Sequence, residues 1–226
     1  MINMIGGIRM AKAKKKNRQN IKEILDILEQ TYPDAKCELN HTTPFELLIA
    51  TILSAQCTDV RVNKVTEELF KKYNTAEAFA KLSTDEIGQE IKSCGLYKSK
   101  AQKIKETSVI LCSEYGGEVP NTMEELTKLP GVGRKTANVV LSNAFGVDAI
   151  AVDTHVFRVS NRIGLVKTDT PEKTEFELMK VLPKKRWSQA HHLIIFHGRR
   201  MCKARKPDCV ICPLTKYCDY YQEGND

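Results

Sequence analysis

Four cysteines near the end of this 226-residue sequence have the spacing of a metal site. The pattern C-x6-C-x2-C-x5-C is formed by Cys202, Cys209, Cys212 and Cys218. Zinc and a [4Fe-4S] cluster both accept four thiolates. Zinc ribbons usually pair two C-x2-C knuckles, and this segment contains one. The spacing predicts one metal centre, and on residues alone both metals remain open.

A second segment has the composition of a phosphate-binding turn. Residues 129–137 read Leu-Pro-Gly-Val-Gly-Arg-Lys-Thr-Ala and lie between two helical patterns. Pro130 ends the first helix, and Gly131 and Gly133 allow positive φ and close approach of a ligand to the backbone. The second helix then presents N–H groups and the positive end of its dipole, which together can bind a phosphate.

Two side chains in and after this turn could carry out chemistry. Lys135 falls in the first turn of the second helix, next to Arg134. The positive end of the helix dipole and the Arg134 guanidinium both disfavour the charged form of its amine. On residues alone, Lys135 could equally be a surface lysine that binds phosphate. Asp153 is placed to cap a helix that starts at Thr154, which would fix its carboxylate in position. His155 is expected to be structural.

The elements that must position these residues read as helices. Ile21, Ile24, Leu25 and Leu28 form one apolar helical face, and an apolar helix runs from Pro44 through Leu53 behind a capping box. Further N-terminal caps occur at Ser83, Thr122 and Thr170. Strand signals are nearly absent, and residues 149–152 read as a connector. The sequence predicts an all-α fold.

Positive charge is concentrated rather than spread along the chain. Of the net charge of +7, six charges fall in a leader over residues 1–19, which is expected to be disordered, and the remainder is near +1. A second basic run without acids covers residues 184–206, and a smaller set is Lys98, Lys100, Lys103 and Lys105. No apolar run is long enough to span a bilayer, and no secretory signal is present. A cytoplasmic location is therefore expected.

The 129–137 segment resembles the helix–hairpin–helix signature of the endonuclease III family of DNA glycosylases, and the Val-Asp-Thr-His segment at 152–155 and the cysteine spacing resemble that family too. The resemblance implies a bifunctional DNA N-glycosylase and abasic-site lyase of base excision repair, acting on oxidised pyrimidines. It implies Lys135 as the nucleophile that forms a Schiff base, Asp153 as the catalytic carboxylate, and a [4Fe-4S] cluster held by the four cysteines.

The same resemblance implies residues that reach the base. A base in a duplex must be flipped out before its glycosidic bond is accessible. The segment Ser54–Asp59 resembles the one whose glutamine fills the vacated space, here Gln56, and Gly95–Tyr97 resembles the loop whose leucine wedges into the stack, here Leu96. The hairpin contacts to DNA phosphates are expected from Gly131, Val132, Gly133, Arg134 and Thr136.

The implied architecture has two helical domains. A six-helix barrel over residues 37–147 would contain the hairpin at about 122–145, and residues 20–36 with 148–226 would form a helical domain around the cluster. Double-stranded DNA with damaged bases or abasic sites would be the partner, bound across the groove between the domains by a monomer. In a prokaryote the enzyme would be associated with the nucleoid.

Two alternatives are weighed against this interpretation. The first is a related glycosylase that acts on adenine mismatches or alkylated bases. Lys135 argues against it, and so does the expectation that no further C-terminal domain follows residue 226. The second is a non-catalytic DNA-binding protein with a zinc-stabilised helical fold, which would give Lys135 and Asp153 no role.

Overall fold

The chain folds into helices that form two compact units. The computed structural model describes residues 20–224, so the basic leader expected over residues 1–19 lies outside the described range. Helices and turns but no strands occur between residues 20 and 224, which confirms the all-α class. One unit is Cys37–Ala149, here called the hairpin unit. The other, the terminal unit, combines the described residues up to Lys36 with those from Ile150 onward.

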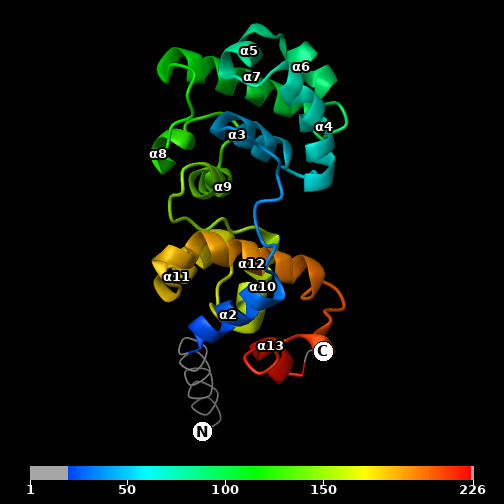
Figure 1. The fold of residues 1–226 in the computed structure, drawn as a ribbon, viewed down its shortest axis with the longest axis vertical. Helices are drawn as coiled ribbons and strands as arrows, with labels where there is room; N and C mark the ends of the chain where they lie inside the picture. Colours follow the sequence, from blue (N-terminus) through cyan, green and yellow to red (C-terminus); the bar gives the residue numbers. More distant parts are fainter. Residues whose placement is uncertain (1–19, 225–226) are drawn as a thin grey trace. The chain divides into compact units, whose positions relative to one another are not determined.

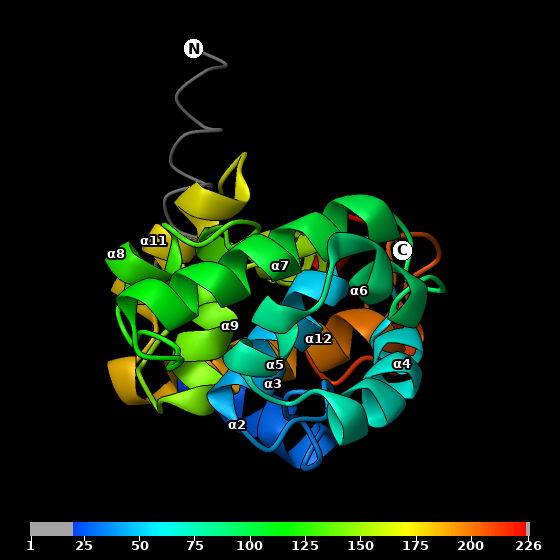
Figure 2. The ribbon, with the colours of Figure 1, turned by 90° about the horizontal axis from the view of Figure 1, so that it is seen from above.

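The hairpin unit is built around one fully apolar helix. Its helices are α3 (Pro44–Leu53), α4 (Asp59–Lys72), α5 (Ala76–Lys81), α6 (Thr84–Glu90), α7 (Tyr97–Glu114), α8 (Met123–Leu126) and α9 (Arg134–Ala144). Every residue of α3 after Pro44 is buried, as its sequence predicts. This helix packs against α4, α7 and α9, and α7 also packs against α5 and α6 (Figure 2).

The start of α3 is fixed by local hydrogen bonds. Thr43 caps the helix by accepting a hydrogen bond from the Glu46 backbone N–H, and Pro44 occupies the first helical position. The predicted capping-box contact differs in one partner. The Glu46 carboxylate accepts hydrogen bonds from the N–H and hydroxyl of Thr42, at 2.6 and 2.7 Å, rather than from the Thr43 N–H. Because Glu46 is buried, its carboxylate needs such hydrogen-bond donors in place of water.

The terminal unit has its own apolar core. Its helices are α2 (Ile21–Thr31), α10 (Thr154–Ile163), α11 (Pro171–Val181), α12 (Trp187–Arg200) and α13 (Asp219–Gln222), with short 3-10 turns at Lys184–Arg186 and Cys209–Ile211. The helix α12 packs against both α2 and α10 (Figure 1). The apolar face predicted for α2 is the buried one, with Ile24, Leu25 and Leu28 almost completely inaccessible to solvent.

The segment between α9 and α10 has no regular structure, as predicted for a connector. Gly146, two residues after the end of α9, has a φ of +65°, which glycine adopts without strain. Across the described residues, no helix combines the length and apolar character needed to cross a membrane.

Candidate active site and metal centre

The glycine turn between α8 and α9 contacts α7 through a hydrogen bond. Thr107 of α7 donates a hydrogen bond to the Pro130 carbonyl at 2.9 Å. Leu129 and Val132 are buried in the core of the hairpin unit, and the Val132 N–H bonds to the Leu129 carbonyl at 3.1 Å. The turn is therefore rigid, and its exposed main chain has a fixed direction.

The two glycines of the turn have different roles. Gly131 has φ of +82°, and a Cβ at this position would lie 3.0 Å from the Lys103 side chain. Gly133 has φ of −89° and ψ of 177°, so the expected positive φ does not occur there. Any residue can adopt that extended conformation. A Cβ on Gly133 would meet nothing within 4 Å, so glycine at this position leaves open surface where a ligand can approach the backbone.

Lys135 lies in the first turn of α9. The N-cap residue of this helix is Gly133, and no side chain caps the helix start. Acidic residues are also absent from the first turn, so the positive end of the helix dipole is not neutralised locally. The Lys135 side chain is exposed, which makes its amine accessible to a bound molecule.

Gln56 and Leu96 lie on neighbouring loops of the hairpin unit. A Cβ on Gly95 would lie 3.7 Å from the Gln56 carbonyl oxygen, so the two loops touch at their backbones. Both residues have a left-handed backbone, with φ of 54° at Gln56 and 59° at Leu96. Their side chains are exposed, and Leu96 retains 60% of its accessible surface. Two strained, non-glycine residues with exposed side chains are typical of a functional site rather than of a stable core.

A buried lysine joins the elements that carry these loops. The ammonium group of Lys100, in the first turns of α7, donates a hydrogen bond to the Leu53 carbonyl at the end of α3, at 2.8 Å. Burial lowers the pKa of Lys100. Lys103 packs under Gly131, and Lys105 bonds to the Ala80 carbonyl. Two of the four lysines, Lys100 and Lys105, therefore use their amines in internal hydrogen bonds, whereas Lys98 and Lys103 are exposed.

Asp153 caps α10 as predicted. Its Oδ1 accepts hydrogen bonds from the His155 and Val156 N–H groups, each at 2.8 Å. The side chain is half-buried. Both hydrogen bonds fall on one oxygen, so the carboxylate is held rigidly while Oδ2 is left to act on a ligand.

His155 next to this cap has structural contacts. Its Nδ1 lies 3.2 Å from the Arg158 guanidinium, which in turn donates hydrogen bonds to the Gly198 and Cys202 carbonyls. Burial lowers the pKa of His155. These contacts agree with the structural role expected for this residue.

The four cysteines of the spaced motif line one pocket in the terminal unit. Cys202 follows α12, Cys209 begins a 3-10 turn that Cys212 follows, and Cys218 precedes α13. The pocket has about 350 Å³ of space between its lining atoms, part of it open to solvent. Ile163, Met201, Leu214 and Tyr220 also line it.

This arrangement fits a cluster better than a single ion. Within residues 20–224, no three His, Cys, Asp or Glu side chains converge closely enough to hold one metal ion. Thiolates around a larger pocket suit a four-iron core, which each cysteine binds at a different iron atom. Burial raises the pKa of Cys212 and, to about 11, that of Cys218. A bound cation must therefore stabilise the thiolate form of these side chains.

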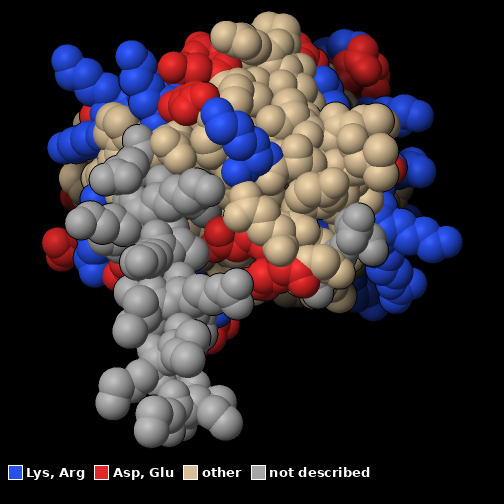
Figure 3. Space-filling model, turned by 90° about the horizontal axis from the view of Figure 1, so that it is seen from below, with Lys and Arg blue, Asp and Glu red and all other residues tan. Residues whose placement is uncertain are grey.

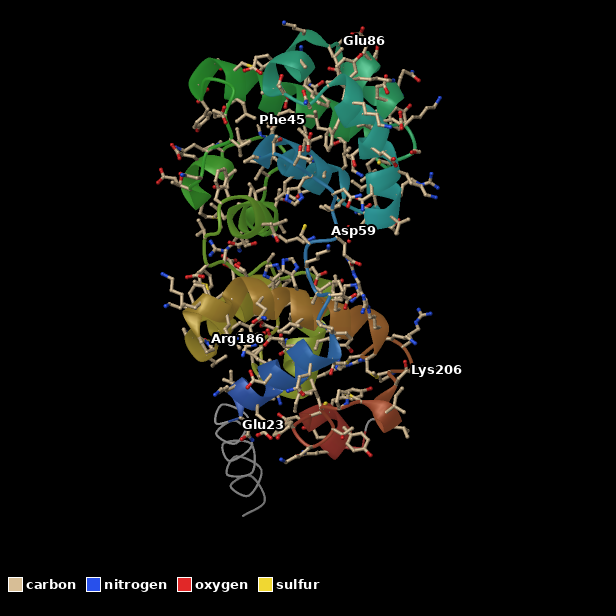
Figure 4. All side chains as sticks on the ribbon, viewed as in Figure 1. Glu23, Phe45, Asp59, Glu86, Arg186 and Lys206 are labelled. Atoms are coloured by element: carbon tan, nitrogen blue, oxygen red, sulfur yellow. The ribbon has the colours of Figure 1, made fainter. Side chains whose placement is uncertain are left out.

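The basic run at residues 184–206 is partly neutralised by acids from α2 and its surroundings. Arg186 forms ion pairs of 2.7 and 2.9 Å with Asp26 and Glu29, and Arg200 pairs with Asp34 at 2.7 Å. Lys206, in contrast, is exposed on the loop between α12 and α13 (Figure 4). On the face shown in Figure 3, basic and acidic groups both lie around an uncharged area. Charge alone therefore does not define a DNA-binding surface.

Comparison with known proteins agrees with the sequence motifs. The family model described as HhH-GPD superfamily base excision DNA repair protein matches residues 49–184. The model described as the iron-sulfur binding domain of endonuclease III matches residues 202–218, which begin and end with the outer cysteines of the motif. This second match rules out the zinc alternative.

Individual relatives cover almost the whole chain. Endonuclease III of Rickettsia conorii is 52% identical over 203 residues, which are 90% of this chain and 97% of the relative. Endonuclease III of Bacillus subtilis is also 52% identical, over 89% of this chain and 93% of its own. A solved structure of a trapped endonuclease III–DNA covalent intermediate has a TM-score of 0.88 and 51% identity, and covers 92% of this chain and 99% of the solved chain.

The two family models cover the hairpin, the Asp153 segment and the four cysteines, and the relatives that match almost the whole chain are endonuclease III enzymes. The matches therefore favour neither the non-catalytic alternative nor a glycosylase for adenine mismatches or alkylated bases. The chain belongs to the endonuclease III family of base excision DNA repair enzymes: it is a DNA glycosylase and abasic-site lyase that carries a [4Fe-4S] cluster.

Proposed function

We propose that Lys135 is the nucleophile of this glycosylase and lyase. Its amine attacks C1′ of the deoxyribose, the glycosidic bond breaks, and the base leaves, so that an imine joins enzyme and sugar. The imine acidifies the C2′ proton. Loss of that proton breaks the bond between C3′ and its phosphate oxygen, and water then releases the enzyme.

The position of Lys135 carries this proposal. Its exposed amine projects from the first turn of an uncapped helix, beside a turn whose main chain can approach a phosphate. The similar solved structure is described as a trapped covalent intermediate of endonuclease III with DNA, which supports a covalent bond between enzyme and DNA in this family. A lysine that only bound phosphate would not require a covalent step.

Asp153 supplies the negative charge that the reaction needs. We assign its free carboxylate oxygen to the stabilisation of positive charge on the sugar and to activation of Lys135 or a water. The His155 and Val156 N–H groups bind Oδ1 and thereby fix the orientation of the whole carboxylate, including Oδ2, before DNA binds. The cap therefore contributes preorganisation, which reduces the cost of ordering the site during the reaction.

The hairpin binds DNA phosphates through its backbone. Val132 is 5% exposed, so its main chain rather than its side chain makes contact, and Gly131 and Gly133 allow that approach. Arg134 and Thr136 extend this phosphate site into the first turn of α9. Because such contacts do not read base sequence, they suit an enzyme that searches all DNA.

The four spaced cysteines, Cys202, Cys209, Cys212 and Cys218, would hold the cluster through their thiolates. The cluster supplies folding energy to a segment with few regular elements, and it also holds the loop residues Lys203, Arg205 and Lys206 in place. The proposed role of the cluster is therefore structural: it would position these basic side chains for contact with DNA phosphates.

Gln56 and Leu96 act on the duplex when the base is flipped. We propose that Leu96 wedges into the base stack and that Gln56 fills the space left by the extruded base. Their contacting loops and left-handed backbones support a shared role, since neither conformation is favoured for a non-glycine residue.

Replacing Leu96 with glycine is expected to stabilise the protein and reduce its activity. The left-handed conformation costs an L-residue about 1–2 kcal/mol, and glycine's extra freedom in the unfolded chain returns about 0.5–1 kcal/mol of that. The free energy of unfolding should therefore rise, by up to about 1.5 kcal/mol. Loss of the wedge should lower kcat/KM on lesion-containing duplexes about 10-fold or more. Urea unfolding and single-turnover kinetics measure the two effects.

Leu96→Ala provides the matched control for this experiment. Alanine removes the wedge but keeps a Cβ in the left-handed region, so activity should fall as in Leu96→Gly without a gain in stability. The two variants thus separate the side chain from the backbone. Full activity in either variant would contradict the assigned role of Leu96.

Oxidised pyrimidines in double-stranded DNA are the proposed substrates. A panel of duplexes should therefore show the highest kcat/KM for oxidised thymine and cytosine, with at least about 10-fold lower values for alkylated purines and adenine mismatches. The preference is measured with one lesion per duplex in a single sequence context. Equal rates across the panel would contradict this substrate class.

We further propose that the enzyme works as a monomer in the cytoplasm, on the nucleoid if its source is prokaryotic.

A further inference from the structure

A buried histidine connects α2 to one of the cysteines of the cluster motif. His197 of α12 is 1% exposed, and its Nε2 lies 3.7 Å from Cys212 Sγ. Its other ring nitrogen, Nδ1, lies 3.0 Å from the hydroxyl of Tyr32, which is itself 4% exposed. The two aromatic rings meet edge-on with centroids 5.8 Å apart. All three residues belong to the terminal unit.

The chemistry of the sulfur determines which nitrogen carries the proton. A cysteine bound to iron is a thiolate and has no proton to donate. His197 Nε2 must therefore carry the hydrogen if it bonds to Cys212. In a neutral imidazole Nδ1 is then an acceptor, and the Tyr32 hydroxyl donates to it. The opposite tautomer would direct a lone pair at the sulfur and leave the tyrosine as an acceptor.

Tyr32 is well placed to enforce this choice. Its backbone N–H bonds to the Leu28 carbonyl at 2.8 Å and closes the end of α2, and the Arg200 guanidinium lies 5.8 Å from its ring centroid. Arg200 is in turn paired with Asp34. The Tyr32 hydroxyl therefore belongs to a buried side chain that follows directly on α2.

We propose that His197, oriented by Tyr32, is a positioning residue that donates a hydrogen bond to the Cys212 sulfur and thereby tunes the cluster. A donor at a ligand sulfur stabilises the more electron-rich, reduced cluster and so raises its reduction potential. It also holds the ligand in the orientation required for binding iron. The proposal rests on Cys212 being a ligand.

The test compares three variants of the loaded protein. His197→Leu removes the donor, His197→Gln keeps an N–H near the position of Nε2, and Tyr32→Phe removes only the hydroxyl that fixes the tautomer. The reduction potential is measured by spectroelectrochemistry, and iron release to a chelator is followed by absorbance. His41→Leu, in the hairpin unit, controls for loss of a histidine.

His197→Leu is expected to move the potential to more negative values and to release iron about 10-fold faster. Tyr32→Phe should shift both quantities in the same direction by less, and His197→Gln should stay close to the parent. Unchanged potential and iron release in His197→Leu would overturn the proposal. Equal shifts in the leucine and glutamine variants would do the same, because they would point to packing rather than to a donor.

Two further outcomes remain informative. If His197→Leu does not load iron, Tyr32→Phe decides, since it leaves the imidazole in place, and an unchanged potential there contradicts the role of Tyr32 and the proposal with it. Cys212→Ala separates the ligand assignment from the hydrogen bond, because alanine has no atom that can bind iron. A normal [4Fe-4S] spectrum in that variant would reject Cys212 as a ligand, whereas loss of the cluster there with no effect of His197 would reject only this inference.

Discussion

Replacing Lys135 with glutamine is expected to abolish the covalent complex that borohydride traps between the enzyme and abasic DNA. Reduction by borohydride converts the imine into a stable amine, so the trapped product reports directly on the nucleophile. Glutamine retains a similar length but has no basic nitrogen. Cleavage of the DNA strand should fall at least about 1,000-fold, which is the scale seen when an enzyme loses its covalent nucleophile.

DNA affinity separates this role from simple phosphate binding. Removal of one exposed positive charge should weaken binding only modestly, about 10-fold or less, and should reduce the salt dependence by about one ion. A phosphate-binding lysine would show that affinity loss while the trapped adduct persisted. Lys128→Gln is a suitable control, because Lys128 is exposed in the same unit and paired with Glu124 at 3.6 Å. Its variant should be trapped as efficiently as the parent.

Local signals in the sequence were sufficient to predict several helix starts, including that of α10, which Asp153 caps. Thr43, Ser83, Thr122 and Thr170 each accept a hydrogen bond from a backbone N–H in the first turn of their helix. Asp153 does so as well. A cap depends on residues within one turn of each other, so it is visible in the sequence without knowledge of the tertiary fold.

Long-range contacts were not predictable in this way. The sequence shows Lys100 in a basic set, but the folded chain buries it against the Leu53 carbonyl, 47 residues away. Arg186 pairs with Asp26 and Glu29, which lie about 160 residues earlier in the chain. Such pairs form only when distant helices pack, so a run of like charge in the sequence does not establish a charged surface.

The left-handed backbone conformations at Gln56 and Leu96 were also not predictable from local sequence patterns. Neither residue is glycine, and neither is asparagine or aspartate, the types most often found in the left-handed region. Only the resemblance to a glycosylase family pointed to these positions. Backbone strain of this kind is maintained by the surrounding packing, here the loops that meet at Gly95 and the Gln56 carbonyl.

Replacing Asp153 with asparagine is expected to reduce turnover about 100-fold or more with little change in folding or DNA binding. Asparagine is an effective N-cap, so its side-chain oxygen can accept the same two hydrogen bonds from the His155 and Val156 N–H groups. The variant loses the negative charge that stabilises the developing positive charge on the sugar. Single-turnover rates at saturating enzyme measure this loss separately from binding.

Two further variants separate the cap from the chemistry. Asp153→Ala should lose the same activity and, in addition, about 1 kcal/mol of unfolding free energy, because the α10 N–H groups lose their acceptor. Asp169→Asn, at an exposed aspartate of the same unit that pairs with Lys173, should retain activity. If Asp153→Asn bound DNA far more weakly but turned over at the parental rate, the carboxylate would act in binding and not in catalysis. The expected pattern has the opposite form: turnover falls while DNA affinity is retained, because loss of a negative charge does not weaken electrostatic attraction to DNA.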